Sequence, residues 1–148
     1  MRPSYAFRIP VESDWNSQET DLDVQYLQRL VFGKSNDQIQ EYFGENRSIE
    51  RADEMLFAPR AVFQYYVQGF AKFMLSERAR GDSDSASAFL GLLEARENRD
   101  QGSVKNIYSL LASCVDFIAN NQTYFNASKE IYGDFNERAV GIRRVCDR

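Results

Sequence analysis

The stretch from Pro59 to about Ala79 repeats apolar residues at the spacing of an α-helix. The repeat falls on a set of seven residues at intervals of three and four: Val62, Phe63, Tyr66, Val67, Phe70, Phe73 and Met74. An apolar face this wide has to be covered by several other elements. Proline suits the first turn of a helix, and the residue before it avoids the helical region. The pattern therefore predicts a central helix that begins at Pro59.

The rest of the chain carries the same spacing in shorter pieces. Helices are predicted over 21–33, 35–44, 48–57, 85–96 and 103–118, and in a last segment from about residue 128. Strand-like alternation occurs only near the N-terminus, at Tyr5, Phe7 and Ile9. We therefore expect an all-α, single-domain orthogonal bundle of six or seven helices over residues 1–148. The first 20 residues should form an irregular or extended segment packed on this bundle.

Length and charge exclude several classes of protein. A chain of 148 residues suits one domain, and its net charge of −4 disfavours binding to nucleic acid. No apolar run reaches the roughly 18–20 residues that a membrane span needs. The N-terminus lacks the apolar region of a secretory signal, so we expect a cytoplasmic protein.

Catalytic chemistry has few candidates. The chain has no histidine, its two cysteines form no CxxC pair, and it contains no glycine-rich phosphate loop, so no cofactor is expected. Two acidic groups have helical spacing and are the candidate magnesium ligands: Glu50, Asp53 and Glu54, and Glu94, Glu97 and Asp100.

These acidic groups resemble the paired acidic helices of all-α nucleotide pyrophosphohydrolases. The resemblance implies a magnesium-dependent hydrolase as an alternative function. Arginines flank both groups, however, at Arg47, Arg51, Arg96 and Arg99. Arginines at this spacing are more typical of exposed ion pairs on a helix surface, which is the interpretation we favour.

Acidic residues are concentrated in the first third of the chain. Residues 12–54 hold eleven acidic and four basic residues, a net charge of −7. Such a surface either keeps the protein soluble or attracts a basic partner. Trp and Tyr are frequent anchors of protein interfaces. The predicted partner-binding residues are therefore Trp15, Asp21, Asp23, Glu41, Tyr42, Glu45 and Tyr65.

The segment ADEMLFAPRAVFQYYVQGFAKFML resembles a family of small, uncharacterised bacterial all-helical domains that share a Pro-x-Ala-Phe-x-Tyr-Tyr-like helix start. The matching residues are Met55, Leu56, Phe57, Pro59, Ala61, Phe63, Tyr65 and Tyr66, with one extra residue between proline and phenylalanine. Domains of this kind look like immunity proteins, which neutralise a bacterial toxin by direct contact. The resemblance implies a non-enzymatic binding protein with a cognate protein toxin as its partner. A helical adaptor or a homodimeric scaffold is the remaining alternative.

Overall fold

The computed structural model describes residues 4–15 and 21–147, and within these ranges it contains helices and turns but no strand. The predicted all-α fold is confirmed for this part of the chain. The elements, in order, are η1 (Ser4–Phe7), α1 (Glu12–Trp15), α2 (Leu22–Val31), η3 (Gln40–Tyr42), α3 (Arg47–Leu56), α4 (Arg60–Met74), η4 (Glu77–Ala79), α5 (Ser83–Arg99), η5 (Lys105–Ile107), α6 (Tyr108–Asn120), α7 (Lys129–Tyr132) and α8 (Phe135–Cys146). The η elements are short 3-10 helices, and α1 and α7 are single turns.

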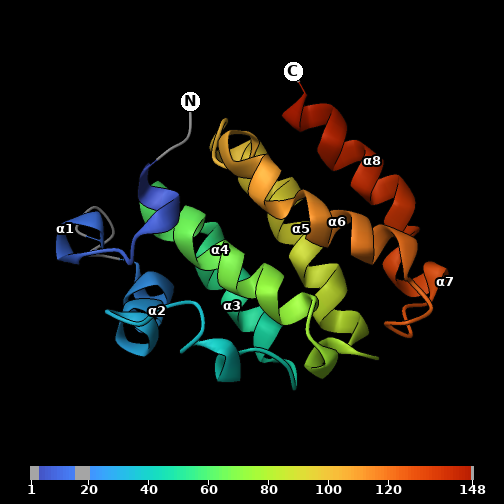
Figure 1. The fold of residues 1–148 in the computed structure, drawn as a ribbon, viewed down its shortest axis with the longest axis horizontal. Helices are drawn as coiled ribbons and strands as arrows, with labels where there is room; N and C mark the ends of the chain where they lie inside the picture. The colour runs from blue at the N-terminus through green and yellow to red at the C-terminus, as the bar shows by residue number, and fades with distance from the viewer. Residues whose placement is uncertain (1–3, 16–20, 148) are drawn as a thin grey trace.

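Helix α4 is the central element, as its apolar spacing predicts. It contacts α3, α5, α6 and the N-terminal turns, while α8 packs on α5 and α6 at the far side of the bundle (Figure 1). Pro59 stands at its N-cap, and Phe63, Tyr66 and Phe70 are completely buried. The helix ends at Met74, before the predicted limit of 79, and the chain turns into η4. The core is one cluster of buried side chains that surrounds α4.

The N-terminal segment packs on the bundle, but it is not extended. Residues 4–7 form a 3-10 turn and residues 12–15 a helical turn, so the alternation of Tyr5, Phe7 and Ile9 does not produce a strand. No strand in the described ranges is available to pair with it, so its backbone makes local turns instead. Gln68 of α4 donates from Nε2 to the carbonyl oxygen of Ala6 at 2.6 Å and fixes the first turn in place.

Several helix ends differ from the prediction, because the serines expected to cap α3 and α6 make other hydrogen bonds. Asn46 stands at the N-cap of α3, and Ser48 lies inside that helix, where its Oγ accepts from the backbone N–H of Gly44 at 3.0 Å. Ser103 is buried and bonds to a side chain of α5, so α6 begins later, at Tyr108. The last predicted helix is divided into α7 and α8 by Gly133, whose φ of 77° interrupts the helix.

Candidate partner-binding face

Trp15 is buried, so its prediction as an exposed anchor is wrong. Only 3% of its surface is exposed, and its ring centroid lies 6.4 Å from that of Tyr66 in the core. Trp15 is the last residue of the short helix α1, and its large side chain packs that turn against α4. Burial of this large apolar side chain outweighs any gain from exposing it. A partner cannot reach Trp15 unless this segment moves.

Tyr42 and Tyr65 are half-buried, and their hydroxyl groups have partners within the chain. Lys34 donates from Nζ to the hydroxyl oxygen of Tyr42 at 2.6 Å. The hydroxyl oxygen of Tyr65 accepts from the backbone N–H of Asn36 at 3.1 Å. Both tyrosines therefore hold the loop between α2 and η3 in place, and both side chains remain partly exposed.

Asp21 and Asp23 are neighbours with different roles. Asp21 is the N-cap of α2: its Oδ1 accepts from the backbone N–H groups of Asp23 at 3.0 Å and Val24 at 3.1 Å. Asp23 is exposed, and it makes no ion pair with any other described residue. The pKa of Glu54 on α3 is raised mainly by burial, against the opposing bonds from Arg51, and the charge of Asp23 raises it further. Asp23 therefore lies beside α3.

Glu41 and Glu45 lie at the same hollow, and two arginines accompany them. Both acids line a hollow of about 220 Å³ at the start of α3, which Arg47 and Arg78 also line. The turn that carries Glu45 is sharp, because Gly44, Glu45 and Asn46 all have positive φ angles, of 87°, 47° and 70°. Both carboxylates are exposed, and neither makes an ion pair within the described ranges.

Each of the two acidic groups proposed as magnesium ligands contains one buried acid. Glu54 is 6% exposed and Glu97 is 5% exposed, so their interpretation as part of an exposed ion-pair surface is wrong. Arg51 donates to Glu54 through Nε at 2.6 Å and through a terminal nitrogen at 2.9 Å. Glu97 accepts from three backbone N–H groups of the loop after α5, at 2.6, 2.8 and 2.9 Å. Both carboxylates have partners that a metal ion would have to displace. Within residues 4–15 and 21–147, no group of three or more potential ligands is assembled for a metal.

Arg96 is also buried, although the sequence predicts an exposed arginine. Its guanidinium donates to the backbone carbonyls of Met55, Leu56 and Ala58 at 3.2, 3.0 and 2.6 Å. The last carbonyl groups of a helix lack partners within the helix. Arg96 supplies donors where α3 ends and so holds that end against α5. Its role is structural.

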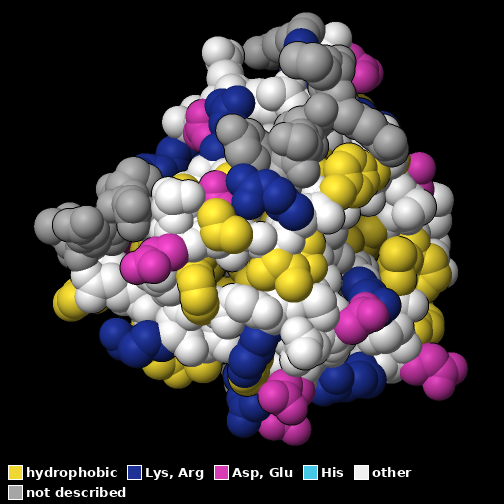
Figure 2. Space-filling model, turned by 60° about the vertical axis from the view of Figure 1, so that its left-hand side comes forward, with side chains coloured by type: hydrophobic (Ala, Val, Ile, Leu, Met, Phe, Trp, Pro, Cys, Tyr) yellow, Lys and Arg dark blue, Asp and Glu magenta, His cyan; other side chains and the backbone are white. Residues whose placement is uncertain are grey.

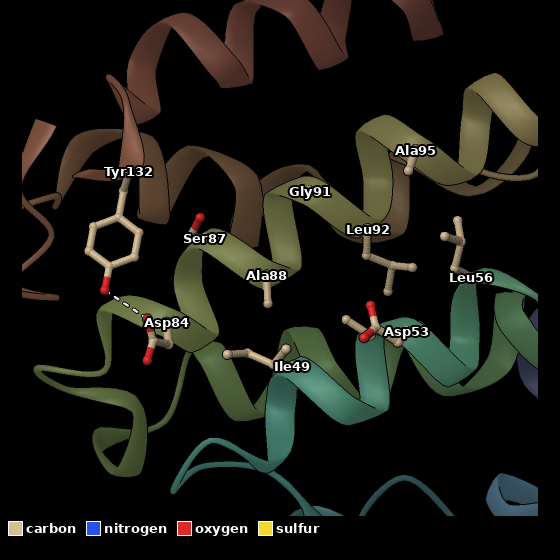
Figure 3. A pocket seen from close by; sticks show the side chains of 11 residues that line it. Ile49, Asp53, Leu56, Asp84, Ser87, Ala88, Gly91, Leu92, Ala95 and Tyr132 are labelled. Atoms are coloured by element: carbon tan, nitrogen blue, oxygen red, sulfur yellow. Dashed lines mark hydrogen bonds between the residues drawn. The ribbon is translucent and has the colours of Figure 1, made fainter. Parts of the chain in front are cut away.

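The feature that the sequence analysis missed is a groove between α3 and α5 with a volume of about 330 Å³. Ile49 of α3 and Ala88 of α5 point toward each other across it, and Leu92 lies opposite Asp53 (Figure 3). The available signal was the spacing of Ala88, Gly91 and Ala95 on α5, since small residues at helical intervals leave room beside a neighbouring helix.

Two acids lie in this groove. Asp84 accepts from the hydroxyl group of Tyr132 at 2.7 Å, while Asp53 is exposed and has no ion pair within the described ranges. Asp82, just before α5, lines the separate hollow at the start of α3 together with Glu45.

The surface around α2 and α3 mixes apolar and charged groups. Leu22, Tyr26 and Ile49 are all more than one-third exposed, and the ring of Tyr26 lies near the guanidinium groups of Arg29 and Arg51. In the view that brings the α1 and α2 side forward, hydrophobic side chains lie between basic and acidic ones (Figure 2). The net charge of residues 12–54 therefore does not become a continuous acidic patch on this face.

No helix in the described ranges is long and apolar enough to cross a membrane. Comparison of the chain with protein-family models, with curated proteins and with solved structures found no match.

Proposed function

We propose that this protein is a non-catalytic immunity protein, which neutralises a bacterial toxin in the cytoplasm by binding a basic surface of that toxin. The observation that carries the proposal is a set of exposed carboxylates near α3 that have no ion pair within the described ranges: Asp23, Glu41, Glu45 and Asp53. Such carboxylates are available to a partner, and their field accelerates the approach of a basic protein.

Several other exposed acids of the chain are paired within the bundle itself. Asp37 pairs with Lys72, Glu94 with Arg138, and Asp116 with Arg143. The unpaired set is thus distinct from ordinary ion pairs at the surface. It also adjoins exposed apolar groups on α2 and α3, a combination that is typical of the rim and core of a protein interface.

The hydrolase alternative receives less support from the geometry. Magnesium binding by both acidic groups requires Glu54 to leave Arg51, and Glu97 to leave three backbone N–H groups. The adaptor alternative remains distinguishable by mass, since a homodimer has twice the mass of the 148-residue chain in light scattering.

The experiment uses the proteins encoded by the genes next to this one. Each is co-expressed with this protein to measure rescue of growth, and binding is measured with purified proteins by calorimetry. We expect a toxic neighbour whose toxicity is abolished by stoichiometric binding. The proposal is overturned if no neighbour is toxic, or if a toxic neighbour neither binds nor is neutralised.

A triple charge reversal tests whether these exposed carboxylates bind the toxin. The variant Asp23→Lys, Glu41→Lys and Asp53→Lys leaves the Asp21 cap intact. The control is Glu130→Lys, Glu137→Lys and Asp147→Lys, which changes net charge equally at exposed acids of the last helices. The first variant should slow association at least tenfold at low salt. Equal slowing by both variants would mean that only net charge matters.

A further inference from the structure

We propose that the groove between α3 and α5 receives one arginine side chain of the protein partner. This inference rests on the proposed function and names the contact at its centre. The groove is on the surface, and no segment within the described ranges fills it.

The size of the groove suits a single long side chain. Pockets for drug-sized ligands occupy about 300–1,000 Å³. At about 330 Å³, this groove lies at the lower limit of that range. Its walls are largely apolar, formed by Ile49 and Leu56 of α3 and by Ala88 and Leu92 of α5. The methylene groups of an arginine pack well against such walls while its charged end stays near water.

The charges of the groove favour a cation. Asp53 and Asp84 both line it, and among the residues that the structure describes no lysine or arginine does. Asp84 accepts one bond from Tyr132 and so keeps further acceptor capacity, while Asp53 has no ion pair within the described ranges. Within the described ranges, Arg138 bonds to Ser87 of the lining and pairs with Glu94 at 2.9 Å. Arg96 bonds to the backbone carbonyl of Leu56 and pairs with Asp100 at 3.1 Å. The charges of both arginines are therefore offset.

Arginine suits these groups better than lysine. The guanidinium is planar and presents several donors. It is also more weakly hydrated than an ammonium group, so it loses less hydration free energy on entering a half-enclosed site. It also forms paired hydrogen bonds with a carboxylate. Arginine is among the residues that dominate the energetics of protein interfaces when they fill a pocket.

The test is an NMR titration of the complete protein with N-acetyl-arginine N-methylamide. The matched probe is the citrulline analogue, which has a similar shape and no charge. We expect saturable shifts at the methyl groups of Ile49, Leu56, Ala88 and Leu92 with the arginine probe only. The inference is overturned if both probes shift these groups equally, or if the arginine probe shifts exposed acids throughout the surface without preference.

Variants test whether the arginine probe binds in the groove or only responds to the acidity of the whole surface. Asp53→Asn removes charge, and Ala88→Leu fills the groove without changing charge. Each should weaken binding of the arginine probe at least fivefold. Asp147→Asn removes the same charge at an exposed acid outside the groove and should change binding less than twofold. Similar weakening by Asp147→Asn and Asp53→Asn would overturn the inference.

Failure of this inference and failure of the proposed function give different results. If the toxin binds and Ala88→Leu leaves its affinity unchanged, the groove is not the contact and the proposed function stands. If the arginine probe binds in the groove but no neighbouring toxin does, the proposed function fails and the groove remains an arginine site. A thermal melt of each variant confirms that it is folded.

Discussion

Replacing Arg96 by methionine removes a set of three hydrogen bonds that joins α5 to the end of α3. Methionine keeps an unbranched apolar stem, so the space near the helix axis stays filled. The change deletes the bonds to the carbonyls of Met55, Leu56 and Ala58, and the bond from Nε to the hydroxyl oxygen of Ser103 at 2.9 Å. It also deletes the 3.1 Å ion pair with Asp100.

The expected loss of unfolding free energy is about 3–5 kcal/mol, because oxygen atoms at the end of α3 and at Ser103 lose their donor. The ion pair with Asp100 adds little, since Asp100 is one-third exposed and keeps Arg60 as a partner. Each buried acceptor left without a donor costs roughly 1–3 kcal/mol. A sum over all four acceptors exceeds this range, but the end of α3 can relax and admit water. A domain of this size is stable by only about 5–15 kcal/mol, so the loss is a large fraction of the total. The melting temperature should fall by roughly 6–20 °C.

Urea unfolding followed by circular dichroism measures this loss, with Arg99→Met as the control. Arg99 is exposed and lies 4.5 Å from the centre of the Phe57 ring. Its removal should cost about 1 kcal/mol or less, as for an exposed cation and ring. Equal destabilisation by the two variants would refute the structural role of Arg96. A full recovery of stability in Arg96→Lys would refute the need for a planar group with several donors.

The remaining predictions concern one carboxylate, one helix cap and the two thiols. Hydrogen bonds from Arg60 hold the pKa of Asp100 below its ordinary value, so the stability from this ion pair is complete above about pH 4 and is lost as the pH falls through the lowered pKa. The difference in unfolding free energy between wild type and Asp100→Asn should therefore shrink in acid, and a constant difference would contradict the ion pair. Asp21→Ala removes the cap of α2 and should cost about 1 kcal/mol in urea unfolding, while Asp21→Asn keeps a cap and should be close to wild type; equal losses would argue against capping. Burial raises the pKa of Cys114 to about 12 and that of Cys146 to about 11. Ellman's reagent should thus react quickly with both thiols only in unfolded protein, and rapid reaction of Cys114 in native protein would show that it is not buried.

Local signals in the sequence predicted the helical framework well. The start of α4 follows from Pro59 alone, because the ring of proline restricts its own backbone and that of the preceding residue. Ser35 and Gln38 form the reciprocal capping bonds that their spacing predicts, at 2.8 and 3.3 Å. These bonds close a turn that leads into a short 3-10 helix. Local sequence signals therefore identified where helical segments occur better than they placed the ends of those segments.

Burial of polar and aromatic groups was harder to predict, because it depends on contacts between distant segments. Trp15 is buried only because the N-terminal segment folds back onto α4. Glu97 is buried because the loop after α5 turns its backbone N–H groups toward the carboxylate. No residue type in that loop predicts this arrangement. The α3–α5 groove likewise arises from the approach of two helices that are separated by the whole of α4.

The contrast between Glu50 and Glu54 shows why charge counts along the sequence do not identify a binding face. Arg47 and Glu50, and Arg51 and Glu54, stand at the same three-residue spacing on α3. Only the second pair is buried and bonded at 2.6 Å, because those positions face α2, where the ring of Tyr26 lies 5.6 Å from the Arg51 guanidinium. The packing of α3 thus buries Glu54, which no longer contributes to the charge of the surface. Asp53, one residue earlier, is left exposed in the groove. The orientation of α3 therefore decides which of its own carboxylates are available to a partner.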